Sequence, residues 1–470
     1  MSDLSLPLPS FIKPEHANSY RYMMSQLVPT STAQAPYAAH EFLLGLPEVD
    51  DDYWLANVIA LAAQLQELDV ARLTQLPLPG VRSLVKLYCV LAGRLQFDAM
   101  QGYEGEICRA AIEGRLGKDE LATMPVRRLL AERGLLEQAQ LNYVQQHFAI
   151  DQREVLPAGQ GIWLGCDANV VGLNFALEAI AAQSHAALDR VGLILLTRNG
   201  TAIPAMLEAA KKFKNAVMIH YTCEAELVES LRAKKMRVFI ELHGLQNPVT
   251  FIELLKSGVA NTQLTWAGVA ESCPLPFIDG QLLDPVLSQS PIASCRALPL
   301  RCWLPPPTNF IHIRRGTALG IWSVTPKISK SFLYFAAQLA ARLACKLQLW
   351  TITPHPYLGT LPENVEIVSQ FTDFCPAVLL DTIPLSGGSS CLFALQNGIP
   401  VVTMPGTSIS SRLGASILLH YGFAEGVVAS LDEYAERVVE FYKLSTMPRV
   451  PRQIDWEFVS TVDRFFPADK

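Results

Sequence analysis

The spacing of hydrophobic residues divides the chain into a helical first third and a longer remainder in which short apolar runs alternate with amphipathic stretches. Up to about residue 155, apolar residues recur three and four positions apart, the period of a helix with one buried face. In the segment 126–130 this spacing predicts that the two intervening arginines point outward. The pattern predicts helices at 14–26, 52–67, 80–95, 105–113 and 118–147, the last broken near Gly134. We therefore expect residues 1–155 to form an all-α domain.

From about residue 162 the hydrophobic runs shorten to strand length, with helical segments between them. This alternation is typical of a doubly wound parallel sheet. The predicted strands are 162–166, 191–197, 216–221, 238–242 and 263–267. The predicted helices are 173–183, 205–214, 224–234 and 249–256. We expect residues 156–300 to form one Rossmann-like lobe.

A proline-rich passage at residues 273–307 predicts a connector between domains. The alternation then resumes, which predicts a second sheet and a second Rossmann-like lobe over residues 301–470. Its predicted strands are 319–324, 346–351, 365–368, 377–380 and 400–404, and its last helices are 431–442 and 456–465. The expected fold class is α/β, with two Rossmann-like lobes preceded by an all-α domain.

The stretch after the apolar run 377–380 carries the clearest candidate site. Gly387, Gly388, Ser389 and Ser390 stand where a helix of apolar residues begins, and that helix ends near Gly398. Free backbone N–H groups, serine hydroxyls and the positive end of the helix dipole would meet there, which favours binding of an anion. The alternative for such a loop is an ordinary turn followed by a helix cap.

A second polar loop follows the next predicted strand. It opens with Pro405 and Gly406, contains several hydroxyl side chains, and leads into a helix entry that carries Arg412. Parallel strands end at the same edge of their sheet, where open α/β sheets bind ligands. The two loops together indicate a phosphate or diphosphate site, although Arg412 by itself fits a solvated helix position.

Composition narrows the function class. The chain of 470 residues has 38 basic and 44 acidic residues and a net charge of −6, which argues against a nucleic-acid surface. The ten scattered cysteines contain no Cys-x-x-Cys pair, which favours free thiols in a reducing cytoplasm. We expect a protein without a secretory signal or membrane span. The acidic run 50–52 could bind a metal, but a helix cap is the favoured interpretation.

Three segments resemble the nucleotide-sugar lobe of the O-GlcNAc transferase family, which includes bacterial adhesin N-glycosyltransferases. They are the run Val-Val-Thr-Met-Pro-Gly at 401–406, the Ser-Arg pair at 411–412 and the Leu-Asp-Thr segment at 380–382. The resemblance implies a GT-B fold, a cytoplasmic bacterial enzyme, and a UDP-sugar as co-substrate with neither a metal nor another cofactor.

The resemblance also implies residue roles. The loop Gly387, Gly388, Ser389 and Ser390 matches the family's diphosphate loop, and Lys327 matches a lysine that contacts the diphosphate. Pro405, Gly406 and Arg412 belong to the neighbouring loop. His243, which follows the predicted strand 238–242, and Asp167 are the candidates for catalytic residues near the acceptor. On the same lobe, four further residues fit the family pattern: Gln263, Trp266, Asp279 and Asp284.

Two departures from the family pattern stand out. The loop 165–175 contains no histidine where the family has them, and Phe393 occupies the position of an acidic residue that holds the ribose. A phenyl ring accepts no hydrogen bond from ribose hydroxyls.

These observations leave two main hypotheses. The first is an inverting, metal-independent transferase that moves GlcNAc or glucose from a UDP-sugar to Ser, Thr or Asn of a protein such as an adhesin or flagellin. In it the helical domain binds the acceptor or another subunit, as a homo- or hetero-oligomer. The second is a glycosyltransferase-like scaffold subunit without turnover that partners an active transferase. A transferase acting on a lipid or glycan is a third class, but no membrane-facing stretch supports it.

Overall fold

The chain folds into two compact units. The computed structural model describes, apart from isolated positions, residues 78–147, 156–168, 191–242, 255–266, 277–289, 297–299, 311–351 and 360–444. The first unit consists of Met1–Asn142 together with Val324–Ser331 and Thr351–Glu363. The second contains Tyr143–Ser323, Phe332–Trp350 and Asn364–Lys470. Two short segments from the later part of the chain therefore belong to the unit that the N-terminal region builds.

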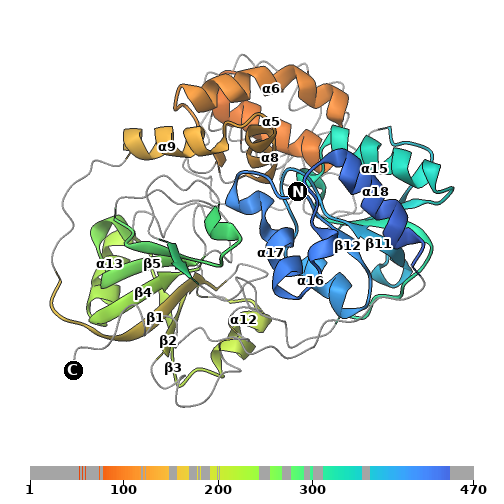
Figure 1. Ribbon diagram of the computed structural model, residues 1–470. Coiled ribbons are helices and arrows are strands. Elements are labelled where there is room, and N and C mark those ends of the chain that lie inside the picture. Colours follow the sequence, from red (N-terminus) through yellow and green to blue (C-terminus); the bar gives the residue numbers. More distant parts are fainter. Residues whose placement is uncertain are drawn as a thin grey trace, which may run out of the picture. The chain divides into compact units, whose positions relative to one another are not determined.

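The described part of the N-terminal region is helical, as predicted. Its helices are α5 (Val81–Gly93), α6 (Phe97–Ile112), α8 (Met124–Glu132) and α9 (Leu136–His147) (Figure 1). The predicted break occurs at Gly134, whose φ of +67° suits glycine. The predicted helices 14–26 and 456–465 lie outside the described residues, as does most of 52–67.

Asp52 acts as a capping residue rather than a metal ligand. Its carboxylate accepts hydrogen bonds from the backbone amides of Arg82 and Ser83, each at 2.9 Å, and from the Ser83 hydroxyl. These amides belong to the first turn of α5, where helical N–H groups lack intrahelical acceptors. Asp52 is itself helical and caps α5 rather than a helix that begins at the acidic run, while Asp50 and Asp51 lie outside the described residues.

The outward orientation predicted for the arginines of α8 is wrong. Arg127 and Arg128 are only 2% and 3% exposed. Arg128 is buried because it has partners inside: its Nη1 contacts both carboxylate oxygens of Glu132 at 3.0 and 3.1 Å, and its Nη2 donates to the Tyr88 hydroxyl at 3.1 Å. Burial lowers the pKa of the Arg127 guanidinium to about 9.

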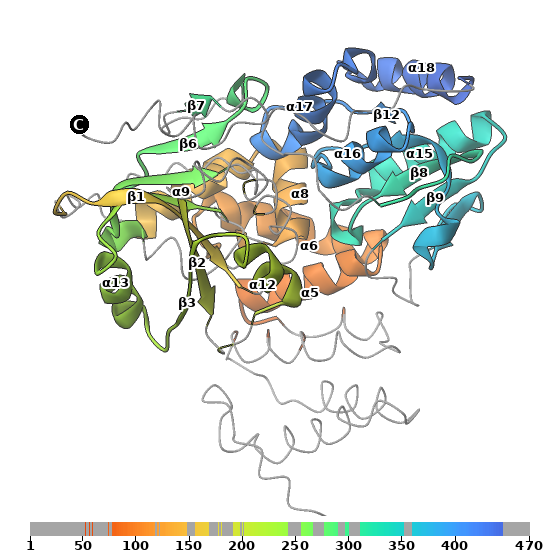
Figure 2. The same cartoon turned by 90° about the horizontal axis from the view of Figure 1, so that it is seen from below.

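The first sheet has seven strands in the order β3-β2-β1-β4-β5-β6-β7, and every pair is parallel. The strands are β1 (Gln160–Asp167), β2 (Val191–Thr197), β3 (Asn215–His220), β4 (Met236–Glu241), β5 (Ala260–Trp266), β6 (Gly280–Leu283) and β7 (Ala297–Pro299). The described helices between them are α12 (Pro204–Ala210) and α13 (Glu224–Arg232) (Figure 2). Strands β6 and β7 lie in the passage predicted to be a connector, so that prediction is wrong for these residues.

The second sheet has five parallel strands in the order β10-β9-β8-β11-β12. The strands are β8 (Ala318–Trp322), β9 (Leu347–Trp350), β10 (Val365–Val368), β11 (Pro376–Leu380) and β12 (Val401–Val402). Its helices are α15 (Lys330–Arg342), α16 (Ser389–Gln396), α17 (Leu413–His420) and α18 (Leu431–Tyr442). Short 3₁₀ turns include η5 (Thr325–Lys327) and η7 (Ile409–Ser411). Helix α16 packs against β12, and α18 packs against β11 and β12 (Figure 1).

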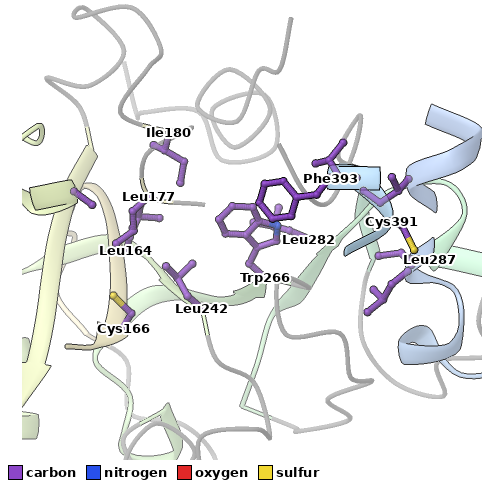
Figure 3. Packing of buried hydrophobic residues seen from close by; sticks show 14 of the residues in the cluster. Leu164, Cys166, Leu177, Ile180, Leu242, Trp266, Leu282, Leu287, Cys391 and Phe393 are labelled. Atoms are coloured by element: carbon purple, nitrogen blue, oxygen red, sulfur yellow. The ribbon is translucent and has the colours of Figure 1, made fainter. Parts of the chain in front are cut away.

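The buried apolar residues of the second unit form one continuous cluster. It runs from Leu164 and Leu242 on the first sheet to Trp266 at the end of β5, and on to Phe393 and Cys391 of α16 (Figure 3). Figure 3 labels Trp266 and Phe393 among the residues of this cluster. Residues from both sheets therefore share one core.

Candidate functional site

The candidate anion loop lies at the carboxyl edge of the second sheet. Strands β11 and β12 pair in parallel, with Leu379 opposite Val401, so the loops that follow them leave from the same edge. The first regular hydrogen bond of α16 runs from Leu392 N to Gly388 O, at 3.1 Å. The amides of Ser389 and Ser390 precede it, so they are available to an anion. This is the arrangement that the sequence predicts.

A buried carboxylate fixes the loop in place. Asp381, 4% exposed, accepts the Gly387 amide on Oδ1 at 2.6 Å and the hydroxyls of Ser386 and Thr403 on Oδ2. The Ser386 hydroxyl oxygen in turn accepts the Gly414 amide of α17 at 2.7 Å. One carboxylate thus ties the end of β11 to the loop, to the end of β12 and to the start of α17.

Two glycines are required because the groups around Asp381 approach so closely. A Cβ on Gly387 would lie 2.5 Å from Ser390 Oγ and 3.1 Å from Asp381 Oδ1. A Cβ on Gly414 would lie 2.8 Å from Ser386 Oγ, and closer still to Asp381 Oδ2. Both positions therefore exclude any larger side chain without movement of the loop.

Tyr434 of α18 is hydrogen-bonded to the same edge of the sheet. Its hydroxyl lies 3.0 Å from the backbone oxygen of Asp381 and 2.9 Å from that of Val402, and it can donate to either. Burial raises the pKa of the Tyr434 hydroxyl well above its usual value, and the nearby Asp381 charge adds to the effect. The tyrosine is therefore a neutral donor that holds the ends of β11 and β12 together.

The second polar loop is also internally bonded. The Ser408 hydroxyl accepts the Ser411 amide at 3.3 Å, and the Ser411 hydroxyl donates to the Ser408 backbone oxygen at 2.6 Å. Gly406 lies against Ser411, and its amide donates to the Ser411 backbone oxygen at 3.4 Å. Arg412, half-buried, donates from Nη1 to the Gln289 side chain at 3.3 Å.

The remaining predicted site residues have different surroundings. Lys327 is half-buried and ends the 3₁₀ turn η5, within the compact unit that the N-terminal helices build. Asp167 is the last residue of β1, opposite Leu196 of β2. His243, two residues beyond β4, lies outside the described residues. Their proposed roles therefore stay predictions.

The four residues singled out on the first lobe make internal contacts. Gln263 accepts the Val259 amide at 2.7 Å and donates to two backbone oxygens, and Asp279 accepts the Gln263 amide at 2.7 Å. Asp284 caps the turn that follows it and accepts the Ser416 hydroxyl of α17. Trp266 is buried in the core. Each of these contacts has a structural role.

Phe393 is a core residue. It is 2% exposed, and its ring stacks on Trp322 at 5.6 Å between centroids with an interplanar angle of 18°. Trp322 contacts Trp350 at 5.5 Å and Phe371 at 5.0 Å. The departure from the family pattern at residue 393 is therefore accompanied by an aromatic cluster at the ends of β8 and β9.

The described residues show neither a metal-binding cluster nor a membrane-spanning helix. Among them, no group of three or more His, Cys, Asp or Glu side chains is placed to hold a metal ion. None of the described helices combines the length and apolar character needed to cross a bilayer.

Comparison with known proteins supports the fold and the resemblance. No family model matches the chain. The chain is 24% identical over 254 residues to each of two proteins named probable UDP-N-acetylglucosamine–peptide N-acetylglucosaminyltransferase SPINDLY, from Petunia hybrida and Arabidopsis thaliana. Each alignment covers 46% of this chain and 27% of the relative, so the chain spans about a quarter of the length of these relatives.

Among solved structures, a mutant of the Thermobaculum terrenum O-GlcNAc transferase matches with a TM-score of 0.69 at 16% identity. That match covers 92% of this chain and 91% of the other. The predicted fold class, two Rossmann-like lobes of the GT-B type preceded by an all-α domain, is confirmed. The chain thus resembles an O-GlcNAc transferase in fold along nearly its whole length, and over about half of its length it resembles the SPINDLY proteins in sequence.

Proposed function

We propose that this chain is a glycosyltransferase that transfers a hexose, GlcNAc or glucose, from a UDP-sugar to a protein. The observation that carries the proposal is the loop Gly387–Ser390, held by the buried Asp381 carboxylate at the start of α16. Helix N-termini of this kind bind phosphate groups. The names of the relatives and the GT-B fold support the same activity.

The chemistry needs charge stabilisation at the leaving diphosphate. An acceptor oxygen or amide nitrogen attacks the anomeric carbon, the bond from that carbon to the diphosphate oxygen breaks, and UDP leaves with the electron pair. Negative charge grows on the diphosphate in the transition state, so donors placed there accelerate the reaction. We assign this role to the amides and hydroxyls of Ser389 and Ser390 and to the Lys327 ammonium, without a metal.

The acceptor side of the proposal comes from the resemblance. Asp167 or His243 takes the proton that the acceptor loses, and attack from the face opposite the leaving group inverts the anomeric centre. The acceptor is a Ser, Thr or Asn side chain of a protein of the adhesin or flagellin type, bound with help from the helical domain. Intact-mass analysis of such a protein, co-expressed with this chain, should reveal added hexose or N-acetylhexosamine.

Nucleotide binding tests the donor side directly. Titration calorimetry should show that the protein binds UDP and that Lys327→Ala weakens binding about tenfold, equivalent to about 1.4 kcal/mol. The control is Lys212→Ala, which removes an exposed lysine from the first lobe and should leave the affinity unchanged. Absence of binding by any nucleoside diphosphate would refute the proposed function.

A scaffold subunit without turnover is the second candidate. The buried stack of Phe393 on Trp322 favours it, because an aromatic ring stands where an acidic residue is expected to hold the ribose. In that case the protein binds an active transferase and improves its output, but transfers no labelled sugar by itself. Transfer of label by the purified chain would exclude the scaffold.

A further inference from the structure

The turn that carries Lys327 is held by the N-terminal helices. It directly follows β8, yet Val324–Ser331 belongs to the same compact unit as α5, α6 and α8. Its packing partners are α5 and α8. Thr325, Ile328 and Ser329 are each no more than 2% exposed, so the turn is anchored on both sides of the lysine.

The turn also has a regular backbone. The Lys327 amide donates to the Val324 oxygen and the Ile328 amide donates to the Thr325 oxygen, both at 3.0 Å. Such local bonds alone are too few to order a short 3₁₀ turn against its conformational entropy. The rest of the ordering must come from what the turn packs on.

A hydrogen-bonded chain of side chains connects the turn to the helices. The Ser329 hydroxyl is bonded to the Glu132 carboxylate at the end of α8. The Glu132 carboxylate in turn accepts hydrogen bonds from Arg128, whose guanidinium also donates to the Tyr88 hydroxyl of α5. Arg128 is 3% exposed and Tyr88 is fully buried, whereas the Glu132 side chain is 26% exposed, so the chain of bonds is anchored at its buried α5 end. A second link, the ion pair of Lys330 with Asp98, is exposed and contributes little.

We propose that Glu132 is a positioning residue for Lys327, and that it thereby affects what Lys327 contributes to UDP binding. The proposal rests on the proposed function. A lysine ammonium sits on a flexible stem, and its benefit to a bound diphosphate depends on how well its backbone is placed beforehand. Loss of the Glu132 carboxylate leaves the Ser329 hydroxyl without this acceptor and loosens the turn.

A double-mutant cycle tests the coupling. Glu132→Ala should weaken UDP binding about fivefold in the wild-type background, and should cause no further loss in a Lys327→Met background, because the lysine through which it acts is gone. Ser329→Ala should reproduce the effect, and Ser230→Ala is the control, since Ser230 is an exposed serine of α13 that belongs to the other compact unit. Equal losses from Glu132→Ala in both backgrounds would overturn the proposal.

Hydrogen exchange gives a readout that does not depend on nucleotide binding. In the full chain, the amides of Lys327 and Ile328 should exchange faster in Glu132→Ala and Ser329→Ala, and at the wild-type rate in Ser230→Ala. Unchanged protection in the first two variants would refute the positioning role. If the wild type binds no UDP, the proposed function fails, while the exchange data still decide whether Glu132 holds the turn.

Discussion

The buried carboxylate of Asp381 offers the sharpest test of how the candidate site is built. We consider two substitutions, Asp381→Ala and Asp381→Asn. The native carboxylate accepts three hydrogen bonds, from the Gly387 amide and from the hydroxyls of Ser386 and Thr403. Alanine removes the acceptor of all three bonds and leaves the part-buried Gly387 amide without its partner. Asparagine keeps one acceptor oxygen and the volume of the side chain.

The expected magnitudes follow from this count. Each buried donor left without an acceptor costs about 1–3 kcal/mol, and the hydroxyls can recover part of that by rotating. We therefore expect Asp381→Ala to lower the free energy of unfolding of the second unit by about 3–5 kcal/mol. Asp381→Asn should cost about 1–2 kcal/mol, because it loses the charge but retains an acceptor for the Gly387 amide.

The assay combines urea unfolding with hydrogen exchange. The chain has two compact units, so a single two-state transition is not assumed, and exchange at the Gly387 amide reports the loop directly. The control is Asp373→Ala, which removes an exposed carboxylate from the turn that precedes β11 and should change stability by less than about 0.5 kcal/mol. A cost below about 1 kcal/mol for Asp381→Ala, or equal costs for alanine and asparagine, would refute the reasoning.

Three further predictions follow from the described contacts. Gly414→Ala should destabilise the protein by about 1–3 kcal/mol, because the new Cβ meets the buried Asp381 carboxylate. The control Gly105→Ala, in an open position of α6, should be neutral or stabilising by up to about 1 kcal/mol, and urea midpoints compare the two variants. Burial raises the pKa of the Cys89 thiol to about 11, so at about pH 8 iodoacetamide should modify the exposed Cys223 and spare Cys89, as read by peptide mass spectrometry. Burial also raises the pKa of Glu132, because desolvation of its carboxylate outweighs the opposite effect of its arginine partner. The stability that protonation of Glu132 contributes is therefore complete below its unfolded-state pKa and is lost as the pH rises through its folded-state pKa. Glu132→Gln should remove this pH dependence from urea midpoints measured between about pH 4 and about pH 8.

Much of the sheet architecture could be predicted because buried parallel strands are continuous apolar runs. The predicted strand 191–197 coincides with β2, and 365–368 coincides with β10. Strands β6 and β7 were missed because they are short and lie among prolines, a composition typical of loops. Only their pairings make them strands: β6 pairs with β5, and β7 pairs with β6.

The site was predictable where the signal is local. The glycine and serine residues at the start of α16 form such a signal. The role of Asp381 was not visible, because Thr403 and Gly414 reach it only through the pairing of β11 with β12 and the packing of α17. In the same way, the burial of Arg128 depends on Tyr88, 40 residues earlier in the chain. Partners that meet only in the folded chain leave no mark on hydrophobic periodicity.

The stacking of Phe393 on Trp322 limits which side chains position 393 can accept. A carboxylate introduced at residue 393 would stand against an indole face inside the apolar core, and a buried charge without a partner costs several kcal/mol. A single substitution that introduces an acid at residue 393 should therefore destabilise the fold. Laboratory evolution of an acid at this position should require at least one further substitution, at Trp322 or its neighbours.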